Sequence, residues 1–575
     1  MTKTINKVMS VIVAVAVVMM LGMSSLAAAN YTISITRPAN DKASHTYKAY
    51  QIFTGDLYNN GTSTTLINLQ AGSNLDLAGL KTQLGLAATA TVADVVNKLN
   101  NISEAEAAKK IQASVKETPA PLQAVSGTDL TTTISNVPGP GYYLVTDTID
   151  RTSTEPDGLQ GAVSSFMLQI LGENTAVTVN AKTDVPTMDK VIDEGTGVTA
   201  NTASLGDSVP FKITSKVPDT SKYNRYWFKV SDVLCKGLTF NNDLAITVGS
   251  KTLVKDTDYT LTTSTDTSTG KTTIDIVFKD FKQYTKDSDI TITYSATLND
   301  DADRTKTGND NVAKLIFSND PNHTYTGDNP NDNTVTGETP DKRTVTYTTG
   351  IAVQKVDENG HPLPGATFKI TGTKLDRVAT FATTFTVDNT SGTYYKLKDG
   401  TYTTTPADST TESLYESTTV KYKKTEGTTF ADASNSGTTM TLEKTTDSTG
   451  YVSFEGLAAG TYTITEEAAP SGYKKSDKVY ELVIDSTPTL TSPGWTISYG
   501  NGASAGLTID TNNVNTDGPI LYTFEVENVK GHDLPVTGGI GTTVYYTGGS
   551  VLLLAGVTLL IAKKRNAKTE EKSAS

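Results

Sequence analysis

The segment YTITEEAAPSGY at residues 462–473 has the clearest periodic pattern in the chain. Its first half alternates apolar and polar residues, as expected for a β-strand with one buried face, because successive side chains point to opposite faces. Tyr462, Ile464 and Glu466 then share the inward face, while Glu467 points to solvent. A proline and a glycine end the strand with turn residues. The pattern predicts a β-sandwich strand that carries one carboxylate into the core.

Two further segments place polar residues on core faces in the same way. Lys355 ends the segment IAVQK at residues 351–355, and Asn528 ends FEVEN at residues 524–528. In both segments the preceding inward residues are apolar. A lone amine, amide or carboxylate is costly to bury unless it is paired. We therefore expect Lys355, Glu466 and Asn528 to meet inside one domain.

A second set of the same residue types lies upstream. Lys190, Asp232 and Asn311 each share a strand face with apolar core residues. Taken singly, each is more simply interpreted as a strand-end residue that reaches water. Three such residues in one domain indicate that they face one another. Asn319 lies on the same strand face as Asn311 and is the alternative amide partner.

The segment at residues 462–473 resembles the E-box of collagen-adhesin B-type (CnaB) domains, and residues 360–368 resemble the start of the same domain type. In that family a glutamate promotes an isopeptide bond between a lysine and an asparagine. The resemblance implies a bond between Lys355 and Asn528, promoted by Glu466.

The upstream set resembles a domain of the collagen-adhesin A type. Lys190, Asp232 and Asn311 occupy that family's bond-forming positions by order and spacing. The resemblance implies a second bond, between Lys190 and Asn311, promoted by Asp232.

The chemistry of such bonds needs unusual protonation states. Burial lowers the pKa of a lysine and raises that of a carboxyl group, because a low dielectric disfavours charge. A neutral amine can then attack an amide carbon that the acid polarises, and ammonia leaves. Proximity inside a folded core replaces an enzyme. This is self-processing with a single turnover, and it needs no cofactor and no metal.

The rest of the chain is typical of a mainly β protein with three tandem Ig-like or Cna-type β-sandwich domains. Short Thr- and Val-rich alternating segments are separated by Gly, Asn, Asp and Pro. The region from Leu77 to Glu117 has helical spacing instead, which predicts two short helices inserted in the first sandwich. The expected divisions are a signal peptide at 1–29, an N-terminal β-sandwich domain at 30–182, a middle isopeptide domain at 183–348, a C-terminal CnaB-type domain at 349–530 and a C-terminal segment at 531–575.

Both ends of the chain predict export. Lys3 and Lys7 precede an apolar run, and three alanines before residue 30 supply a cleavage site. At the other end, an apolar run from Ile540 to Ala562 is followed by three basic residues.

The motif before the second apolar run is Leu534-Pro535-Val536-Thr537-Gly538. Together with the run and the basic tail, it resembles the cell-wall sorting signal of Gram-positive surface proteins. The resemblance implies that a sortase cleaves between the last two of these residues and links the chain to the cell wall.

Lys182 lies at the end of the predicted last strand of the first domain. Alternation turns Val177, Val179 and Ala181 inward and Lys182 outward, just before a Pro-containing linker. An exposed lysine is usually only a solvated charge. Major pilins, however, carry their linking lysine at this place, commonly as Tyr-Pro-Lys, where this chain has Asn180-Ala181-Lys182. Another lysine is the alternative.

Over its whole mature length, the chain resembles a sortase-assembled major (backbone) pilin of Gram-positive bacteria. The resemblance implies identical subunits, pilin-specific and housekeeping sortases and peptidoglycan as partners, with minor or tip pilins and host surface ligands as further ones. It places the protein on the cell surface, in a pilus that supports adhesion. A monomeric wall-anchored adhesin or a minor pilin with the same domains is the alternative.

Composition argues against other classes. The net charge of −13 disfavours nucleic acid as a partner, because phosphate binding needs clustered Lys and Arg. The four histidines are scattered, without the spacing of a catalytic or metal-binding set, so we expect a structural protein. A single cysteine, Cys235, cannot form an intramolecular disulfide, although exported proteins often rely on such bonds. The first domain carries Arg37 on its opening strand, and we predict no isopeptide bond there, with Lys48 as the alternative lysine.

Overall fold

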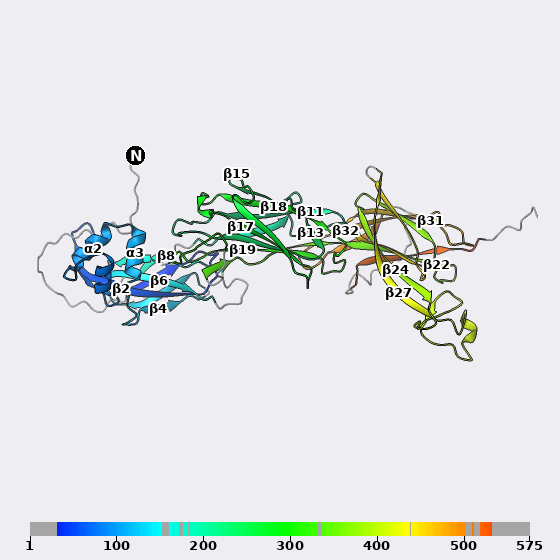
Figure 1. Ribbon diagram of the computed structural model, residues 1–575, viewed down its shortest axis with the longest axis horizontal. Coiled ribbons are helices and arrows are strands. Elements are labelled where there is room, and N and C mark those ends of the chain that lie inside the picture. Colours follow the sequence, from blue (N-terminus) through cyan, green and yellow to red (C-terminus); the bar gives the residue numbers. More distant parts are fainter. Residues whose placement is uncertain are drawn as a thin grey trace, which may run out of the picture.

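The computed structural model describes residues 31–127, 129–151, 160–164, 166–171, 176–181, 184–329, 335–436, 439–500, 509–510 and 518–531. It contains three β-sandwich domains in a row along the long axis (Figure 1). The prediction of a mainly β chain with three sandwiches is therefore confirmed.

The N-terminal domain packs a three-stranded sheet, β5-β1-β8, against a five-stranded sheet, β3-β2-β6-β7 with β4 beside β2. Its first and last strands, β1 and β8, pair in parallel. The elements are β1 (Tyr31–Thr36), β2 (His45–Asn59), β3 (Thr64–Ala71), α1 (Leu77–Gln83), α2 (Val92–Asn100), α3 (Glu104–Gln112), β4 (Leu122–Val125), β5 (Thr131–Val137), β6 (Gly141–Ile149), β7 (Phe166–Ile170) and β8 (Ala176–Asn180).

The helical insertion holds three helices, so the prediction of two was wrong. Asp76, Thr91 and Ser103 each accept a hydrogen bond from a backbone N–H in the first turn of a helix, which satisfies a donor that the helix leaves unpaired. Only three residues separate α2 from α3. The spacing of apolar residues does not reveal this short break, which the Ser103 cap marks as the start of a new helix.

The middle domain has a seven-stranded sheet, β10-β21-β19-β12-β17-β16 with β20 beside β19, and a six-stranded sheet, β15-β14-β18-β11-β9 with β13 beside β18. The elements are β9 (Met188–Ile192), β10 (Ala200–Thr202), β11 (Ser208–Lys216), β12 (Phe228–Leu234), β13 (Leu238–Phe240), β14 (Ala245–Val248), β15 (Lys251–Thr252), β16 (Tyr259–Thr265), β17 (Thr272–Phe278), η1 (Phe281–Gln283), β18 (Asp289–Leu298), β19 (Asn309–Ser318), β20 (Thr336–Glu338) and β21 (Lys342–Tyr347).

The C-terminal domain packs two six-stranded sheets, β27-β24-β30-β22-β35-β34 and β28-β29-β23-β31-β32-β33. Its elements are β22 (Thr349–Asp357), β23 (Thr367–Gly372), β24 (Arg377–Val387), β25 (Tyr395–Lys396), β26 (Tyr402–Thr403), η3 (Glu412–Leu414), β27 (Tyr422–Asp432), β28 (Ser434–Ser436), β29 (Thr439–Thr445), β30 (Tyr451–Leu457), β31 (Gly460–Ala468), β32 (Val479–Ser486), β33 (Trp495–Tyr499), β34 (Ile509–Asp510) and β35 (Leu521–Asn528).

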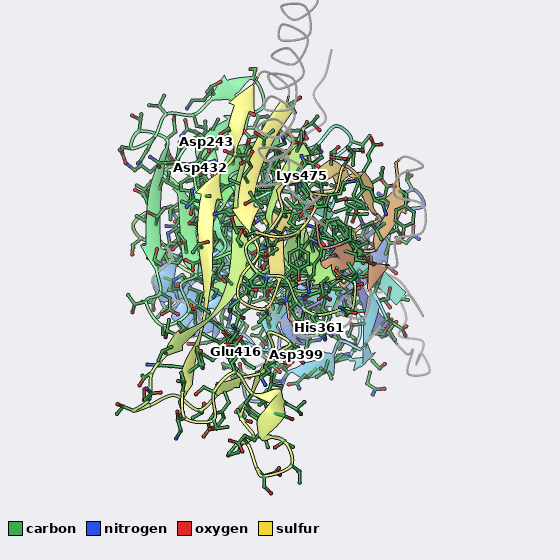
Figure 2. All side chains as sticks on the ribbon, turned by 90° about the vertical axis from the view of Figure 1, so that its right-hand side faces the viewer. Asp243, His361, Asp399, Glu416, Asp432 and Lys475 are labelled. Atoms are coloured by element: carbon green, nitrogen blue, oxygen red, sulfur yellow. The ribbon has the colours of Figure 1, made fainter. Side chains whose placement is uncertain are left out.

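A long hairpin projects from this domain. Its strands β24 and β27 pair along their whole length, and residues 388–421 at the tip form the two-stranded sheet β25-β26 and the turn η3. Figure 1 shows this arm leaving the row of domains, and Figure 2, which looks along the long axis, shows Asp399 and Glu416 in the projecting part. Phe385 stacks on Tyr402 at its tip, so the arm has a small aromatic cluster of its own.

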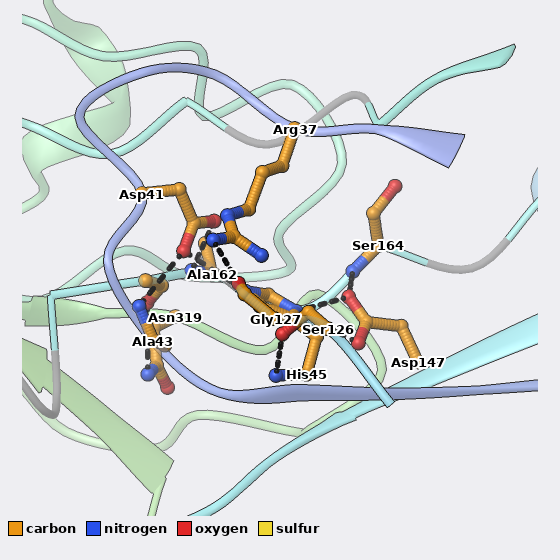
Figure 3. Close-up of polar contacts among 11 residues, drawn as sticks. Arg37, Asp41, Ala43, His45, Ser126, Gly127, Asp147, Ala162, Ser164 and Asn319 are labelled. Carbon is orange, nitrogen blue, oxygen red and sulfur yellow. Dashed lines mark hydrogen bonds and ion pairs between the residues drawn. The ribbon is translucent and has the colours of Figure 1, made fainter. Parts of the chain in front are cut away.

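The N-terminal and middle domains meet through a buried strap, residues 160–164. On one side, Asp41 Oδ2 and Asp147 Oδ2 accept hydrogen bonds from the strap N–H groups of Ala162 and Ser164. On the other side, the strap N–H of Val163 donates to the backbone carbonyl of Asn319 in the middle domain, at 2.7 Å. Figure 3 shows Asp41, Asp147, Ala162, Ser164 and Asn319 together. The strap therefore couples the interior of one domain to the other.

His45 lies between the two carboxylates that hold the strap. Its Nε2 is 2.9 Å from Asp41 Oδ1, and its Nδ1 is 2.9 Å from Asp147 Oδ1. Burial lowers the pKa of His45, but hydrogen bonds to Asp147 and Asp41 outweigh burial and raise that pKa from 6.5 to about 9. Both ring nitrogens can donate only in the protonated imidazole, so His45 is a buried cation at neutral pH.

The middle and C-terminal domains meet without a linker, because only Thr348 separates β21 from β22. The N–H of Leu205 donates to the carbonyl of Gly456 at 2.9 Å, and a Cβ at position 456 would lie 2.4 Å from Leu205 Cγ. Arg304 Nε donates across the junction to Glu455 Oε2, at 2.9 Å. A backbone hydrogen bond, a close packing contact and an ion pair thus join the two domains.

No helix in the described ranges is long and apolar enough to cross a membrane. The predicted signal peptide, LPVTG motif and apolar run from Ile540 to Ala562 all lie outside those ranges.

The raised pKa of His45 predicts that the N-terminal domain loses stability in alkali. The stabilisation is complete below pH 6.5 and disappears as the pH rises through about 9, because only protonated His45 binds both carboxylates. The shift in the pKa of His45 corresponds to about 3 kcal/mol in the free energy of unfolding. In calorimetry of the mature chain, we expect one unfolding transition to fall in temperature over this interval. His45→Gln should lower that transition at pH 6 and remove most of its pH dependence.

The matched control is His361→Gln, which changes a partly exposed imidazole in the C-terminal domain. An equal pH dependence in wild-type and His45→Gln protein would contradict this account of the strap.

Candidate functional site

The core of the middle domain brings together four polar side chains from both sheets. Lys190 on β9 and Tyr294 on β18 belong to one sheet, and Asp232 on β12 and Asn311 on β19 belong to the other. Each is at most 4% exposed. The three residues predicted from alternation therefore do face one another, and a tyrosine joins them.

The amine of Lys190 contacts both predicted partners. Its Nζ donates to Asp232 Oδ1 and lies 2.5 Å from Asn311 Oδ1. The same atom is 3.3 Å from the hydroxyl of Tyr294. The Lys190 amine thus contacts both the carboxylate and the amide that a Lys–Asn condensation would need.

Tyr294 links the acid to the amide nitrogen. Its hydroxyl donates to Asp232 Oδ2 at 2.5 Å and accepts from Asn311 Nδ2 at 2.7 Å. Sequence reasoning missed this residue. The available signal was a hydroxyl on the inward face of β18, whose other inward residues are Ile290, Ile292, Ala296 and Leu298.

The electrostatics of this site favour a neutral amine. Burial lowers the pKa of Lys190 from 10.5 to about 8, and the charge of Asp232 opposes this only in part. The free amine that nucleophilic attack requires is therefore more abundant near neutral pH than it is for an ordinary lysine. Burial, followed by the charge of Asp232, raises the pKa of Tyr294, so its hydroxyl keeps its proton.

Asn319, the alternative amide, is held elsewhere. Its Nδ2 donates to the carbonyl of Gly161 at 3.2 Å, and its Oδ1 accepts from Arg151 at 3.0 Å. Both partners belong to the N-terminal domain. The geometry therefore favours Asn311 as the partner of Lys190 and gives Asn319 a place in the domain junction.

The C-terminal domain assembles its own predicted set. Glu466 is 1% exposed on β31 while Glu467 points outward, which confirms the orientation expected from alternation. Asn528 Nδ2 donates to Glu466 Oε1 at 2.7 Å, and the N–H of Ser476 donates to Glu466 Oε2 at 2.7 Å. Here the acid contacts the amide nitrogen directly.

Lys355 lies at the same end of the core but makes different contacts. It sits on β22 beside Val526 of β35, two residues before Asn528, and its Nζ donates to the carbonyl of Val526 at 2.7 Å. Burial lowers the pKa of Lys355 to about 8, and the charge of Glu466 opposes this. Asn528 Oδ1 is buried and lacks a hydrogen-bond partner among the described residues. The amine is thus a neighbour of the Glu466–Asn528 pair rather than in contact with it.

The N-terminal domain shows no comparable set among its described residues. Arg37 is buried at the end of the opening strand and donates to the carbonyl of Gly127 at 2.9 Å. Lys48 is partly exposed, and its Nζ lies 3.5 Å from Glu117 Oε2. Val177, Val179 and Ala181 turn inward as expected, but Lys182 lies outside the described ranges.

Two parts of the chain match models of known protein families. Residues 205–321 match a family model described as Gram-positive pilin backbone subunit 2, Cna-B-like domain. Residues 349–421 and 407–493 match the SpaA model, described as a prealbumin-like fold domain. The middle and C-terminal domains of the chain are thus similar to domain families of Gram-positive pilins.

The chain has relatives along most of its length. It is 26% identical over 409 residues to the trypsin-resistant surface T6 protein of Streptococcus pyogenes serotype M6, across 67% of this chain and 70% of that protein. Among solved structures, it is similar to the T6 backbone pilin of serotype M6 Streptococcus pyogenes, with 19% identity, a TM-score of 0.49 and coverage of 88% of this chain and 100% of that chain. For the major pilin SpaD of Corynebacterium diphtheriae the identity is 16% and the TM-score 0.43, with coverage of 88% and 98%.

Proposed function

We propose that this protein is a pilin, the major subunit of a covalent pilus, and that autocatalytic Lys–Asn isopeptide bonds brace it from within. The observation that carries the proposal is the contact of the buried Lys190 amine with Asp232 and Asn311. A structural protein has little reason to place an amine, an acid and an amide in a core that apolar residues would fill more stably.

The proposed reaction joins Lys190 Nζ to Asn311 Cγ and releases Nδ2 as ammonia. The lowered pKa of Lys190 supports the free amine as nucleophile. Asp232 accepts a proton from the amine and returns one for the leaving group. The bond would join β9, the edge strand of one sheet, to β19 of the other sheet.

The second proposed bond joins Lys355 to Asn528. Glu466 already contacts the amide nitrogen of Asn528. Asn528 Oδ1, which has no hydrogen-bond partner among the described residues, is an available acceptor for the amine as the lysine side chain turns from Val526. Because this bond joins the first and last strands of its domain, it closes a loop of more than 100 residues. On the chain-entropy model, a cross-link that closes such a loop stabilises the folded domain by roughly 5 kcal/mol.

Polymerisation is proposed to use the two ends of the mature chain. A pilin-specific sortase would cleave after Thr537 and pass its acyl group to Lys182 of the next subunit. A housekeeping sortase would attach the finished polymer to peptidoglycan, with minor or tip pilins and host ligands as further partners. The resemblance of LPVTG to a sorting signal supports the donor, and the place of Lys182 after β8 supports the acceptor. The alternative is a monomeric wall-anchored adhesin or a minor pilin, in which Lys182 stays unlinked.

Intact mass tests the two bonds. The recombinant chain from Asn30 to Thr537 should be lighter than its sequence by two ammonia molecules, because each bond releases one. Lys190→Met and Glu466→Gln should each reduce the deficit to one ammonia, since each removes a reactant or an acid from one domain. The plain sequence mass for the wild-type protein would contradict both bonds.

The choice of amide gives a second, independent prediction. Asn311→Ala should lose the ammonia deficit of the middle domain, whereas Asn319→Ala should keep it, because only Asn311 contacts Lys190. Asn319→Ala is thus the matched control for removing a buried amide from the same face. Cross-linked peptides identified by mass spectrometry would show which residue is joined. A Lys190–Asn319 peptide would refute the assignment.

Wall extracts test the intersubunit bond. Digests of pili should contain a peptide that joins Lys182 of one subunit to Thr537 of another. Lys182→Arg should replace the ladder of polymers on denaturing gels with monomer, because a guanidinium stays protonated and cannot act as the acceptor. Lys48→Arg is the control. A ladder that persists in Lys182→Arg would assign the link to another lysine, and a wild-type protein found only as monomer would favour the adhesin.

A further inference from the structure

The hydroxyl of Tyr294 lies between Asp232 and Asn311, although the tyrosine is not itself a reactant of the proposed bond. It donates to Asp232 Oδ2 at 2.5 Å and accepts from Asn311 Nδ2 at 2.7 Å. Nδ2 is the atom that must leave as ammonia. Tyr294 therefore stands between the acid and the leaving group.

The reaction needs such a bridge because of where Asp232 lies. Its Oδ1 contacts the attacking amine and its Oδ2 contacts Tyr294, and in the described structure no hydrogen bond joins it to the Asn311 amide. A proton taken from the amine must nevertheless reach Nδ2, because an unprotonated amide nitrogen is a very poor leaving group. The hydroxyl is the group in contact with both ends of that path.

We propose that Tyr294 is the proton relay of the middle domain, carrying a proton from Asp232 to Asn311 Nδ2 as the Lys190–Asn311 bond forms. This proposal rests on the isopeptide bond proposed above. It makes Tyr294 a fourth catalytic residue of the middle domain, beside the lysine, the acid and the asparagine.

The steps balance without any further reactant. The Lys190 ammonium first gives one proton to Asp232 Oδ1, and the neutral amine attacks Asn311 Cγ to form a tetrahedral intermediate. As Nδ2 becomes pyramidal, its lone pair accepts the proton of Tyr294, and Tyr294 takes the proton of Asp232 in its place. The bond from Cγ to Nδ2 then breaks and ammonia leaves. The second excess proton of the new amide nitrogen returns to Asp232, which ends protonated, and Tyr294 ends as it began.

A hydroxyl suits this role because it can donate and accept at once. Burial and the charge of Asp232 raise the pKa of Tyr294, so the proton to be passed on is present. Phenolate never has to accumulate, since one proton arrives as the other departs.

The C-terminal domain provides an internal contrast. There Glu466 Oε1 accepts directly from Asn528 Nδ2 at 2.7 Å, so the acid can protonate the leaving group itself. Loss of the Tyr294 hydroxyl should thus slow one bond of the molecule and leave the other unchanged.

The experiment follows both bonds in the same mature chain carrying Tyr294→Phe. After a short pulse of expression, samples are digested, and the cross-linked peptides Lys190–Asn311 and Lys355–Asn528 are quantified over time by mass spectrometry. We expect the first to form at least roughly 10²-fold more slowly than in wild-type protein, the typical value of one proton-transfer group. The second should form at the wild-type rate, which also shows that the variant folds.

Tyr226→Phe is the matched control. It removes another buried tyrosine hydroxyl from the same core, one that lacks a hydrogen-bond partner among the described residues. It should form both bonds at the wild-type rate. Equal rates for Tyr294→Phe and Tyr226→Phe would overturn the relay.

A pH profile separates proton transfer from packing. In purified Tyr294→Phe protein, the remaining reaction should decrease as the pH rises through about 8, because Lys190 then loses to solvent the proton that it otherwise gives to Asp232. A midpoint displaced toward 10.5 would mean that water has entered a disturbed core, and would refute the relay. A wild-type chain without any Lys190–Asn311 peptide would instead refute the isopeptide bond itself, so the two failures are distinguishable.

Discussion

The free-energy cost of burying a lysine amine is the main constraint on the structure of the middle domain. Lys190 lies in a core of apolar side chains, where an unpaired ammonium would be prohibitively unstable. The domain meets this cost with one carboxylate, one amide and one hydroxyl drawn from both sheets. Sheet order, strand register and the inward face of each strand must all agree for these groups to meet. The same burial that makes the amine costly also lowers its pKa and makes it reactive.

The three domains handle buried charge in different ways. The middle and C-terminal domains bury a lysine whose pKa falls to about 8. The N-terminal domain buries Arg37 at the end of its opening strand, and a guanidinium cannot lose its proton to become a nucleophile. This domain instead binds protonated His45 between two carboxylates. Its interior is held by an ionic network that also holds the strap to the next domain.

Period-two alternation was enough to predict the inward residues, including the choice of Glu466 over Glu467, because a strand in a sandwich has one buried face. Tyr294 could not be predicted in this way, since a tyrosine on a core face is ordinary and its partners come from the opposite sheet. The His45 network depends on Asp41, which lies in a loop without periodicity. Likewise, the contact of Asn319 with Gly161 and Arg151 appears only when two domains are packed together.

The parallel pairing of β22 with β35 has a mechanical consequence. The chain enters the C-terminal domain at the start of β22 and leaves it at the end of β35, so in the proposed fibre tension would pull these neighbours past each other in shear. In the proposed bonded form, force would run down β22 to Lys355, cross to Asn528 and leave. Nearly all of the domain between those residues, including the projecting arm of β24 and β27, would carry no load. Its surface would be free to change in sequence without weakening the fibre.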